Sequence, residues 1–355
     1  MTNAPFSWFC RPSRLKLPTV LIFFRSNQIF VTIPLALYVI LLHAGALLGA
    51  LPPPANPLEG GLLYQSLFGW AATQPFFSAL TAAMLLFIQA VTVNLLADEF
   101  RLMSERNWFP GLFYVLAASA FPEFLFVSAP LVAATFVPFA LYRIFNAYQK
   151  PNVSETIFDG ALWIGVASLF CPSALWLLVA AYAAYGLVQV FRLQERFVFL
   201  VGAFVPLFLA WLWYFWADRG GDFRSTQWGS LFQVYHFDMS IDTKGILKLG
   251  LVCFILLIFL GGLGSFYARK SIQSQKFVSV LYRFLAVGGA SVLLQNEFHW
   301  ERMILPSAAM GIFLSLSFQS IRNRLLAELS HLAILLFIFY IQFADFFLNL
   351  TNSIF

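Results

Sequence analysis

The feature that most constrains this chain is a series of long apolar runs, separated by short polar stretches, that recurs from residue 28 to residue 350. A helix needs about 20 mostly apolar residues to cross the hydrocarbon core of a bilayer. Backbone polar groups inside that core must bond to one another, so each run is predicted to be an α-helix. We identify eleven candidate spans: 28–50, 76–97, 109–122, 128–147, 157–171, 173–191, 197–216, 246–267, 277–294, 303–319 and 330–350. The third and fifth are short enough to be tilted hairpin pieces.

The composition supports a membrane-embedded chain. Apolar residues make up 61% of the 355 residues and charged residues only 10%, against about 25% charged residues in a soluble domain. So much apolar surface cannot be hidden from water in a protein of this size, and the surplus must face lipid. We therefore predict an all-α, polytopic transmembrane fold. Residues 1–355 are interpreted as one transmembrane domain, because neither outer loop, 51–75 or 217–245, is long enough for a separate soluble domain.

The basic residues indicate an orientation. With a cytoplasmic N-terminus, sixteen of the 21 basic residues fall on the cytoplasmic side, as the positive-inside rule requires. We therefore predict a multi-pass membrane protein with a cytoplasmic N-terminus, and the net charge of +5 gives no reason to expect nucleic acid. Residues 1–25 mix aromatic and basic side chains, which fits either an interfacial segment on the inner leaflet or a disordered basic tail. The stretch 62–70 is amphipathic and is expected to lie along the outer surface.

The sequence contains none of the common metal-binding, phosphate-binding or nucleophile motifs. The cysteines Cys10, Cys171 and Cys253 are widely spaced and are interpreted as free thiols without metal. No phosphate-binding loop, zinc-binding helix or nucleophile elbow is present. Asp345 is the clearest intramembrane carboxylate, and the favoured interpretation is a side chain reaching the outer surface. No chain of carboxylates crosses the bilayer, which weakens a proton-coupled transporter hypothesis.

Acidic residues in three predicted outer loops suggest a different chemistry. Glu59 lies in the first outer loop, and Glu123 lies in the tight turn between the third and fourth spans. The last outer loop, 295–302, contains Glu297, His299, Glu301 and Arg302. A carboxylate can deprotonate a hydroxyl or hold a divalent cation, and Arg and His can neutralise a phosphate.

These are the groups needed to move a sugar from a polyprenyl phosphate to an acceptor at the outer leaflet. The alternative is that they are solvated loop residues, with 299–302 as an anchor at the headgroup boundary. The long loop 217–245 also offers weak candidates for metal binding: Asp218, Asp222, His236, Asp238 and Asp242.

Two resemblances can be drawn. The stretches 24–28, 93–102, 107–110 and 158–160 resemble a family of uncharacterised polytopic membrane proteins common in Bacteroidota. The positions of Glu59, of Phe121-Pro122-Glu123 and of Arg302 before Pro306 are remotely similar to the GT-C membrane glycosyltransferases. That second resemblance implies that Glu59 is the base that activates the acceptor.

The same resemblance gives roles to the other outer residues. Glu123 would assist Glu59 or help to hold a cation, while His299 and Arg302 would contact the lipid phosphate and Glu297 and Glu301 would support them. The chain departs from the GT-C pattern in having Glu rather than Asp in the first loop. It also lacks an Asp-x-Asp pair in the second outer turn and a periplasmic domain.

The leading hypothesis is therefore a GT-C-like envelope glycosyltransferase or lipid-linked sugar binder at the outer leaflet. It requires the three loops to meet in one cavity. The alternatives are a non-catalytic scaffold of a cell-envelope assembly and a lipid or solute transporter, which would need a polar path through the midplane and related halves. Expected partners are membrane lipids, a polyprenyl-phosphate sugar and other envelope proteins; the cofactor is unknown, with a divalent cation as one candidate.

Overall fold

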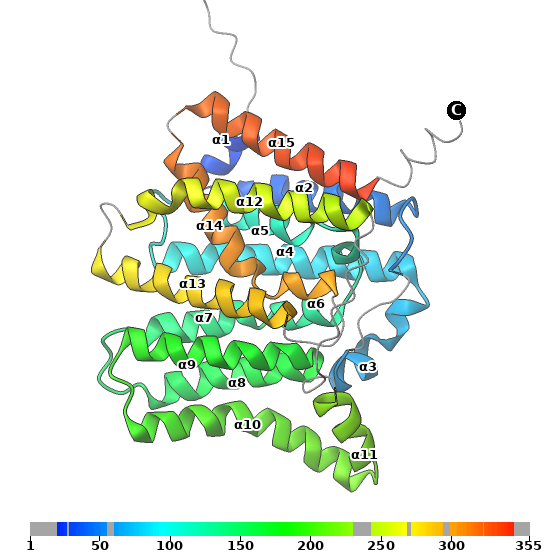
Figure 1. The fold of residues 1–355 in the computed structure, drawn as a ribbon, viewed down its shortest axis with the longest axis vertical. Coiled ribbons are helices and arrows are strands. Elements are labelled where there is room, and N and C mark those ends of the chain that lie inside the picture. The colour runs from blue at the N-terminus through cyan, green and yellow to red at the C-terminus, as the bar shows by residue number, and fades with distance from the viewer. Residues whose placement is uncertain are drawn as a thin grey trace, which may run out of the picture.

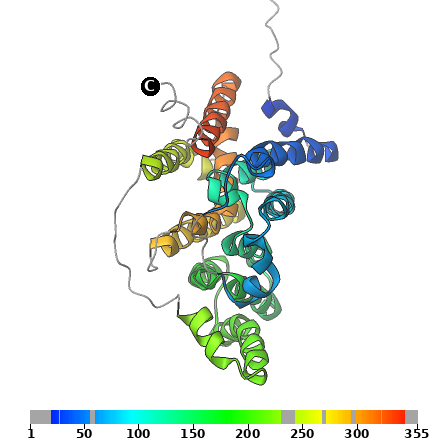
Figure 2. The same ribbon diagram turned by 90° about the vertical axis from the view of Figure 1, so that its right-hand side faces the viewer.

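A computed structural model describes residues 20–26, 28–54, 60–229, 243–267, 271–293, 299–321 and 323–343. This part of the chain is helical and contains no strand. The long helices lie roughly side by side and run back and forth across the molecule (Figures 1 and 2). The helices are α1 Val20–Arg25, α2 Thr32–Leu47, α3 Leu62–Phe68, α4 Pro75–Glu99, α5 Phe109–Ala118, α6 Ala129–Ala134, α7 Val137–Asn146, α8 Ser154–Phe170, α9 Leu177–Val188, α10 Leu193–Trp216, α11 Gly220–Phe223, α12 Thr243–Tyr267, α13 Ile272–Leu293, α14 Ser307–Ser320 and α15 Arg324–Gln342.

Short helical turns connect several of these helices. The 3₁₀ turns are η1 Ile29–Val31, η2 Gly69–Ala72, η3 Pro122–Leu125, η4 Pro172–Trp176 and η6 Trp300–Ile304, and η5 Arg224–Trp228 is a π-turn. The stretch 62–70, expected to be amphipathic, is helical in α3 and η2. α11 and η5 give helical structure to the start of the long loop 217–245.

All eleven predicted spans overlap helices, so their helical character is confirmed. Four described helical segments are long and apolar enough to cross a bilayer: Pro75–Glu99, Ala129–Asn146, Leu193–Trp216 and Arg324–Gln342. Others are apolar but shorter, including α2 and α5. The membrane-protein character is thus supported, while the number of eleven spans stays a prediction.

The third and fourth predicted runs differ most from the structure. The helix expected over 109–122 ends at Ala118, and at about 1.5 Å per residue its ten residues extend only about 15 Å. Every residue of α5 is buried, so this helix lies inside the bundle and does not face lipid. The run 128–147 forms two helices, α6 and α7. Pro138, in the first turn of α7, lacks the N–H that a continuous helix would need there.

Large apolar side chains remain exposed along several outer helices. α10 packs mainly against α8 and leaves most of its length uncovered, and α2, α4 and α15 each have an exposed apolar stripe. An exposed apolar surface of this extent is expected where lipid is the solvent. The most exposed examples include Phe30, Leu37, Met84, Leu95, Phe197, Phe204, Trp213, Trp216, Leu329 and Leu336.

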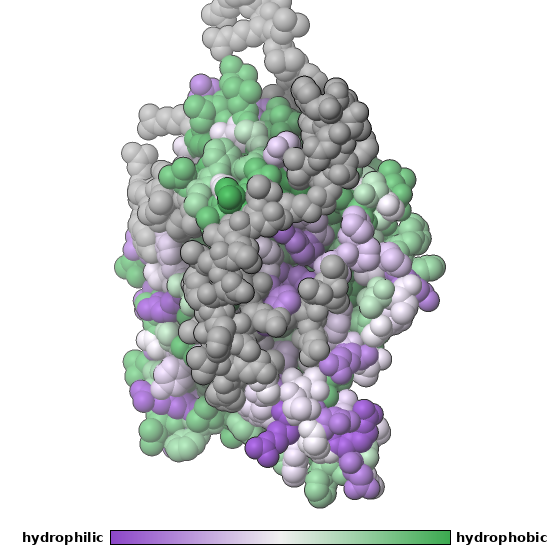
Figure 3. Space-filling model, turned by 45° about the vertical axis from the view of Figure 1, so that its right-hand side comes forward, coloured by the Kyte–Doolittle hydropathy of each residue, from purple (hydrophilic) through white to green (hydrophobic). Residues whose placement is uncertain are grey.

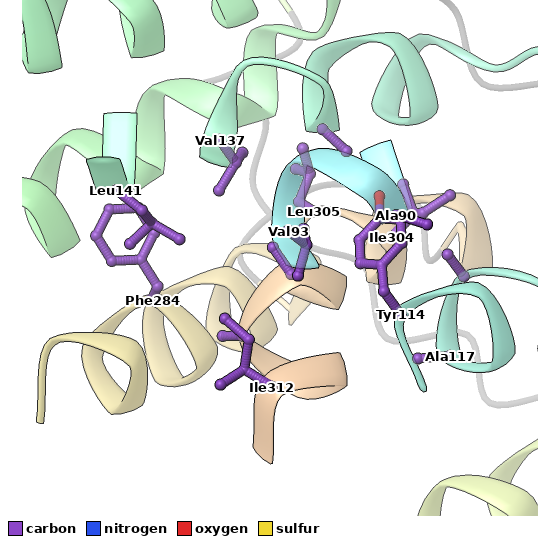
Figure 4. Close-up of a cluster of buried hydrophobic side chains, with 14 of the residues drawn as sticks. Ala90, Val93, Tyr114, Ala117, Val137, Leu141, Phe284, Ile304, Leu305 and Ile312 are labelled. Carbon is purple, nitrogen blue, oxygen red and sulfur yellow. The ribbon is translucent and has the colours of Figure 1, made fainter. Parts of the chain in front are cut away.

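The core lies where the inner helices meet. Figure 4 shows Val93 from α4, Tyr114 from α5 and Ile312 from α14 around one such cluster, with Phe284 from α13 and Leu305 beside them. A polar bridge passes through it: the Tyr114 hydroxyl donates to Gln89 Oε1 at 2.6 Å, and Gln89 Nε2 donates to the Leu131 carbonyl at 2.8 Å. Such bonds tie α4, α5 and α6 together without exposing polar atoms to lipid.

The turns predicted to lie outside gather at one end of the bundle. The Gly61 N–H donates to the Phe170 carbonyl at 2.7 Å, and Gln227 Nε2 donates to the Ser168 carbonyl at 2.6 Å. The Tyr64 hydroxyl donates to the Val127 carbonyl at 3.0 Å. The segments around α3, η3, η4 and η5 are therefore neighbours, and we call this end the outer rim, following the predicted orientation.

The turns predicted to lie inside meet at the opposite end. The Trp108 N–H donates to the Phe24 carbonyl at 2.8 Å, and the Ser104 N–H donates to Gln319 Oε1 at 3.3 Å. This alternation agrees with the order of spans inferred from the charges. Which end faces the cytoplasm stays a prediction.

Candidate functional site

A partly buried ion pair joins two elements at the outer rim. Glu123 lies in η3, and Lys248 lies near the start of α12. The Lys248 ammonium donates to Glu123 Oε1 in a close ion pair, with side chains only 9% and 24% exposed, respectively. The other carboxylate oxygen, Glu123 Oε2, is buried and accepts no hydrogen bond. The pair therefore fastens α12 to η3 and leaves one acceptor unused.

An aromatic group brings a third element to the pair. Lys248 Nζ lies 5.4 Å from the centroid of the Trp300 ring, within the range of a cation–π interaction. Trp300 opens η6, and its ring packs edge-on against Phe121, 5.2 Å between centroids. Phe121 in turn packs against Phe124, 5.1 Å between centroids. The second and the last outer turns therefore meet around Lys248.

A cavity of about 160 Å³, lined mainly by apolar residues together with Glu123, Lys248 and Gln342, opens beside the ion pair. Its walls come from the segment after α2, from η3, from the start of α12 and from the end of α15. Figure 3, which brings this end of the molecule forward, shows hydrophilic residues in the middle of the face with apolar residues above them. The lining residues are Leu51, Pro52, Pro53, Pro54, Pro122, Glu123, Leu247, Lys248, Ile341 and Gln342.

An apolar cavity of about 230 Å³ lies on the other side of η3, and the described residues that line it include no charged side chain. Two of its residues, Val252 and Ile255, follow Lys248 at the i+4 and i+7 positions of α12, so all three share one face of that helix. Its lining is Ala117, Ala120, Phe121, Phe124, Val252, Ile255, Leu285, Gly289, Met303, Pro306, Met310, Phe313 and Leu314. One face of α12 thus passes from a charged pair at the rim to an apolar hollow deeper in the bundle.

The other predicted residues of the last outer loop have different surroundings. Residues three apart lie on one face of a 3₁₀ helix, so Trp300 and Met303 share a face of η6. Glu301 and Arg302 lie on its other faces, only 3% and 6% exposed, and line neither cavity. His299 precedes η6 and is half-buried.

The buried side of η6 faces the first outer loop and the end of α8. Burial, together with the negative charge of Glu301, raises the pKa of Tyr64 to about 12. Glu301 and Arg302 are also near enough to Cys171 to interact with its thiol electrostatically. η6 therefore lies near α3 of the first outer loop, while Glu59 of that loop is outside the described residues.

The predicted site residues are thus only partly brought together. Glu123 and η6 meet at Lys248, while Arg302 and Glu301 are buried beside Tyr64 and Cys171. Glu59, Glu297, His236, Asp238, Asp242 and Asp345 lie outside the described residues. In the long loop, Asp222 pairs with Arg219 at 2.9 Å. Within the described ranges, no three His, Cys, Asp or Glu side chains are grouped for a metal ion.

Two residues of the site were not identified from sequence. In the charge pattern Lys248 is one of the five basic residues outside the cytoplasmic set, and a lysine among apolar residues near the start of a helix calls for a partner. That partner is 125 positions away, and its identity needed the fold. Gln342 stands near the end of an apolar run, where a lone polar side chain is the only signal in the sequence.

Comparisons with known proteins give one structural likeness. No family model matches the chain, and no curated protein matches it. Among solved structures, the chain is similar to ArnT from Cupriavidus metallidurans bound to undecaprenyl phosphate, with a TM-score of 0.49 and 15% sequence identity. The match covers 89% of this chain and 62% of that one, so this chain spans about three fifths of its length. At this level the likeness assigns no activity, and the resemblance to the Bacteroidota family stays a prediction.

Proposed function

We propose that this chain is a GT-C-like envelope glycosyltransferase, or a binder, that takes a lipid-linked sugar at the outer leaflet of the bacterial inner membrane. The observation that carries the proposal is the face of α12 on which Lys248 stands above Val252 and Ile255. It places a charged pair at the edge of an apolar cavity. A ligand that uses both parts must itself have a polar head and an apolar tail.

The arrangement suits a polyprenyl phosphate better than a soluble substrate. The apolar cavity would hold the isoprenoid units nearest the head, and the cationic groups of the rim would face the phosphate. In this proposal His299 and Arg302 contact the phosphate, for which Arg302 has to turn from its buried position on η6 toward the cavity. Glu301 and Glu297 support them, and Glu59 activates the acceptor. Lys248 already neutralises Glu123, so a divalent cation at Glu123 would have to sit beside an ammonium. We therefore assign Glu123 to positioning the site rather than to holding a metal.

Filling the apolar cavity tests the lipid-binding half of this proposal. Val252→Trp places a large ring in the cavity. Leu249→Trp places the same ring outside it, because the Leu249 side chain is 50% exposed on another face of α12. With protein purified in lipid nanodiscs, we expect Val252→Trp to bind undecaprenyl phosphate at least tenfold more weakly than wild type. Leu249→Trp should bind it as wild type does. If wild-type protein binds undecaprenyl phosphate no more tightly than phosphatidylglycerol, the proposal is refuted.

The catalytic half is tested in cells. Glu59→Ala and Arg302→Ala should abolish an envelope glycan product while the amount of protein in the membrane, measured by immunoblot, stays unchanged. A normal glycan in both variants would remove the catalytic roles. Combined with an absence of lipid binding, that result would favour a membrane scaffold.

A further inference from the structure

Lys248 is the cation that stands beside the space a lipid could enter. Among the described residues that line the two cavities, it is the one cationic side chain. It lines the cavity of about 160 Å³ directly, and it shares a face of α12 with Val252 and Ile255, which line the apolar cavity. Arg302, by contrast, is 6% exposed and lines neither cavity. Of these two cations, Lys248 is therefore better placed to meet a phosphate whose tail fills the apolar cavity.

The Glu123 carboxylate occupies the place at Lys248 that such a phosphate would take. Glu123 Oε1 accepts a hydrogen bond from the ammonium, and the centroid of the Trp300 ring lies 5.4 Å from the same nitrogen. Both charged side chains line one cavity, and 24% of the Glu123 side chain is exposed, so the carboxylate has a route to solvent. The ammonium itself is a point charge on a flexible four-carbon stem, and it can turn toward a different anion.

Exchanging one anion for another keeps the Lys248 ammonium compensated. A buried ion pair adds little net stability, whereas a buried charge without a partner is costly. The phosphate of a polyprenyl phosphate is a monoester, like that of a phosphorylated side chain, which carries about −1.5 to −2 charges at pH 7. A carboxylate carries a single negative charge. A lipid phosphate can therefore replace Glu123 at the ammonium, while the released carboxylate turns toward water.

We propose that Lys248 is the phosphate-binding cation of the lipid site, and that Glu123 is the counter-ion which the lipid phosphate displaces. This inference rests on the proposed function, because it takes the apolar cavity as the place of the lipid tail. It assigns a phosphate contact to a residue outside the last outer loop, and it makes the Glu123–Lys248 pair an autoinhibitory contact. Glu123 should then weaken the binding of a phosphorylated lipid and have no effect on the same lipid without its phosphate.

The test compares the binding of undecaprenyl phosphate and of undecaprenol, its uncharged analogue, to full-length protein in nanodiscs. Glu123→Gln keeps the shape of the side chain and removes its charge, while Lys248 keeps its contact with the Trp300 ring. We expect undecaprenyl phosphate to bind about tenfold more tightly than to wild type, because a competing charge-assisted hydrogen bond is lost. Binding of undecaprenol should not change. If the ion pair served only to fasten α12 to η3, Glu123→Gln would weaken the binding of both lipids.

A double variant removes the ammonium without leaving an uncompensated charge. Lys248→Met, Glu123→Gln should bind undecaprenyl phosphate no more tightly than undecaprenol, so that the gain seen in Glu123→Gln is lost. The matched control is Arg219→Met, Asp222→Asn, which removes another ion pair of the outer rim whose residues line neither cavity. This control should bind both lipids as wild type does.

The outcomes separate this inference from the proposed function. If Glu123→Gln binds undecaprenyl phosphate no more tightly than wild type, or if the double variant still prefers the phosphorylated lipid, the exchange at Lys248 is rejected. Weaker binding by Val252→Trp would still support the lipid site in that case. If wild-type protein binds neither lipid, the proposed function fails as well.

A final probe distinguishes a lipid phosphate from a free one. Inorganic phosphate at the same concentration should not displace undecaprenyl phosphate, because it has no tail to fill the apolar cavity. Displacement would identify a site for free phosphate and would reject the lipid as the ligand of Lys248.

Discussion

In the ion pair between Glu123 and Lys248, the effect of each charge on the stability of the fold depends on the presence of the other. Removing two charges from water is costly, so a buried pair adds little net stability over apolar residues of the same size. Removing one partner is different, because the other charge stays buried without compensation. Lys248 lies beside the Trp300 ring, and Glu123 is still partly exposed. Both features reduce the free-energy cost of leaving one charge without its partner, but they do not remove it.

Lys248→Met should therefore be more destabilising than the double variant Lys248→Met, Glu123→Gln. We expect the single change to cost about 2 kcal/mol of unfolding free energy, below the roughly 3–5 kcal/mol of a fully buried pair, because Glu123 is still 24% exposed. The double change should recover at least half of the loss, because no uncompensated charge remains. Thermal unfolding in detergent measures both. Additive losses from the two substitutions would mean that the residues do not interact.

At the scale of elements, the sequence predicts helices well and their interruptions poorly. Apolar runs can only be helical in lipid, which is why each of the eleven runs overlaps a helix. Hydropathy alone cannot distinguish a helix that faces lipid from one enclosed by other helices, since both are apolar. α5 and α14, at ten and 14 residues, show this: both coincide with predicted spans, and nearly all of their residues are buried among other helices.

Close packing of α8 against α10 relies on two glycines. A Cβ on Gly202 would lie 2.5 Å from the Phe158 carbonyl oxygen, and one on Gly165 would lie 2.6 Å from the Ala203 carbonyl oxygen. Both neighbours are backbone atoms, so a larger side chain at either position would force the helices apart. Small residues at membrane helix interfaces allow this close approach of the backbones.

Gly202→Ala is expected to lower the midpoint of thermal unfolding by several degrees, because α10 packs mainly on α8 and would lose that contact. Gly186→Ala in α9 is the matched control, since nothing lies within 4 Å of its added Cβ. That control should be neutral or slightly stabilising, because alanine favours a helix by about 1 kcal/mol over glycine. Equal effects of the two substitutions would show that the α8–α10 contact is not limiting.

At the scale of the whole molecule, the sequence indicated which turns share an end of the bundle but not which side chains meet there. The charge pattern assigned η3 and η6 to one side, and the structure brings both to Lys248. The Glu123–Lys248 contact, by contrast, depends on how α12 lies against η3, which no local pattern encodes. The same is true of Gln342, which lines that cavity only because α15 ends there.

The orientation of the chain can be tested with single cysteines in a variant lacking Cys10, Cys171 and Cys253. The side chain of Asp222, in α11 at the outer rim, is 55% exposed, and Lys150 is exposed at the opposite end. Asp222→Cys should react with a membrane-impermeant maleimide in intact spheroplasts. Lys150→Cys should react only after the membrane is opened, because the positive-inside rule assigns that turn to the cytoplasm. The reverse pattern would place the Glu123–Lys248 cavity on the cytoplasmic face, where sugar transfer at the outer leaflet could not occur.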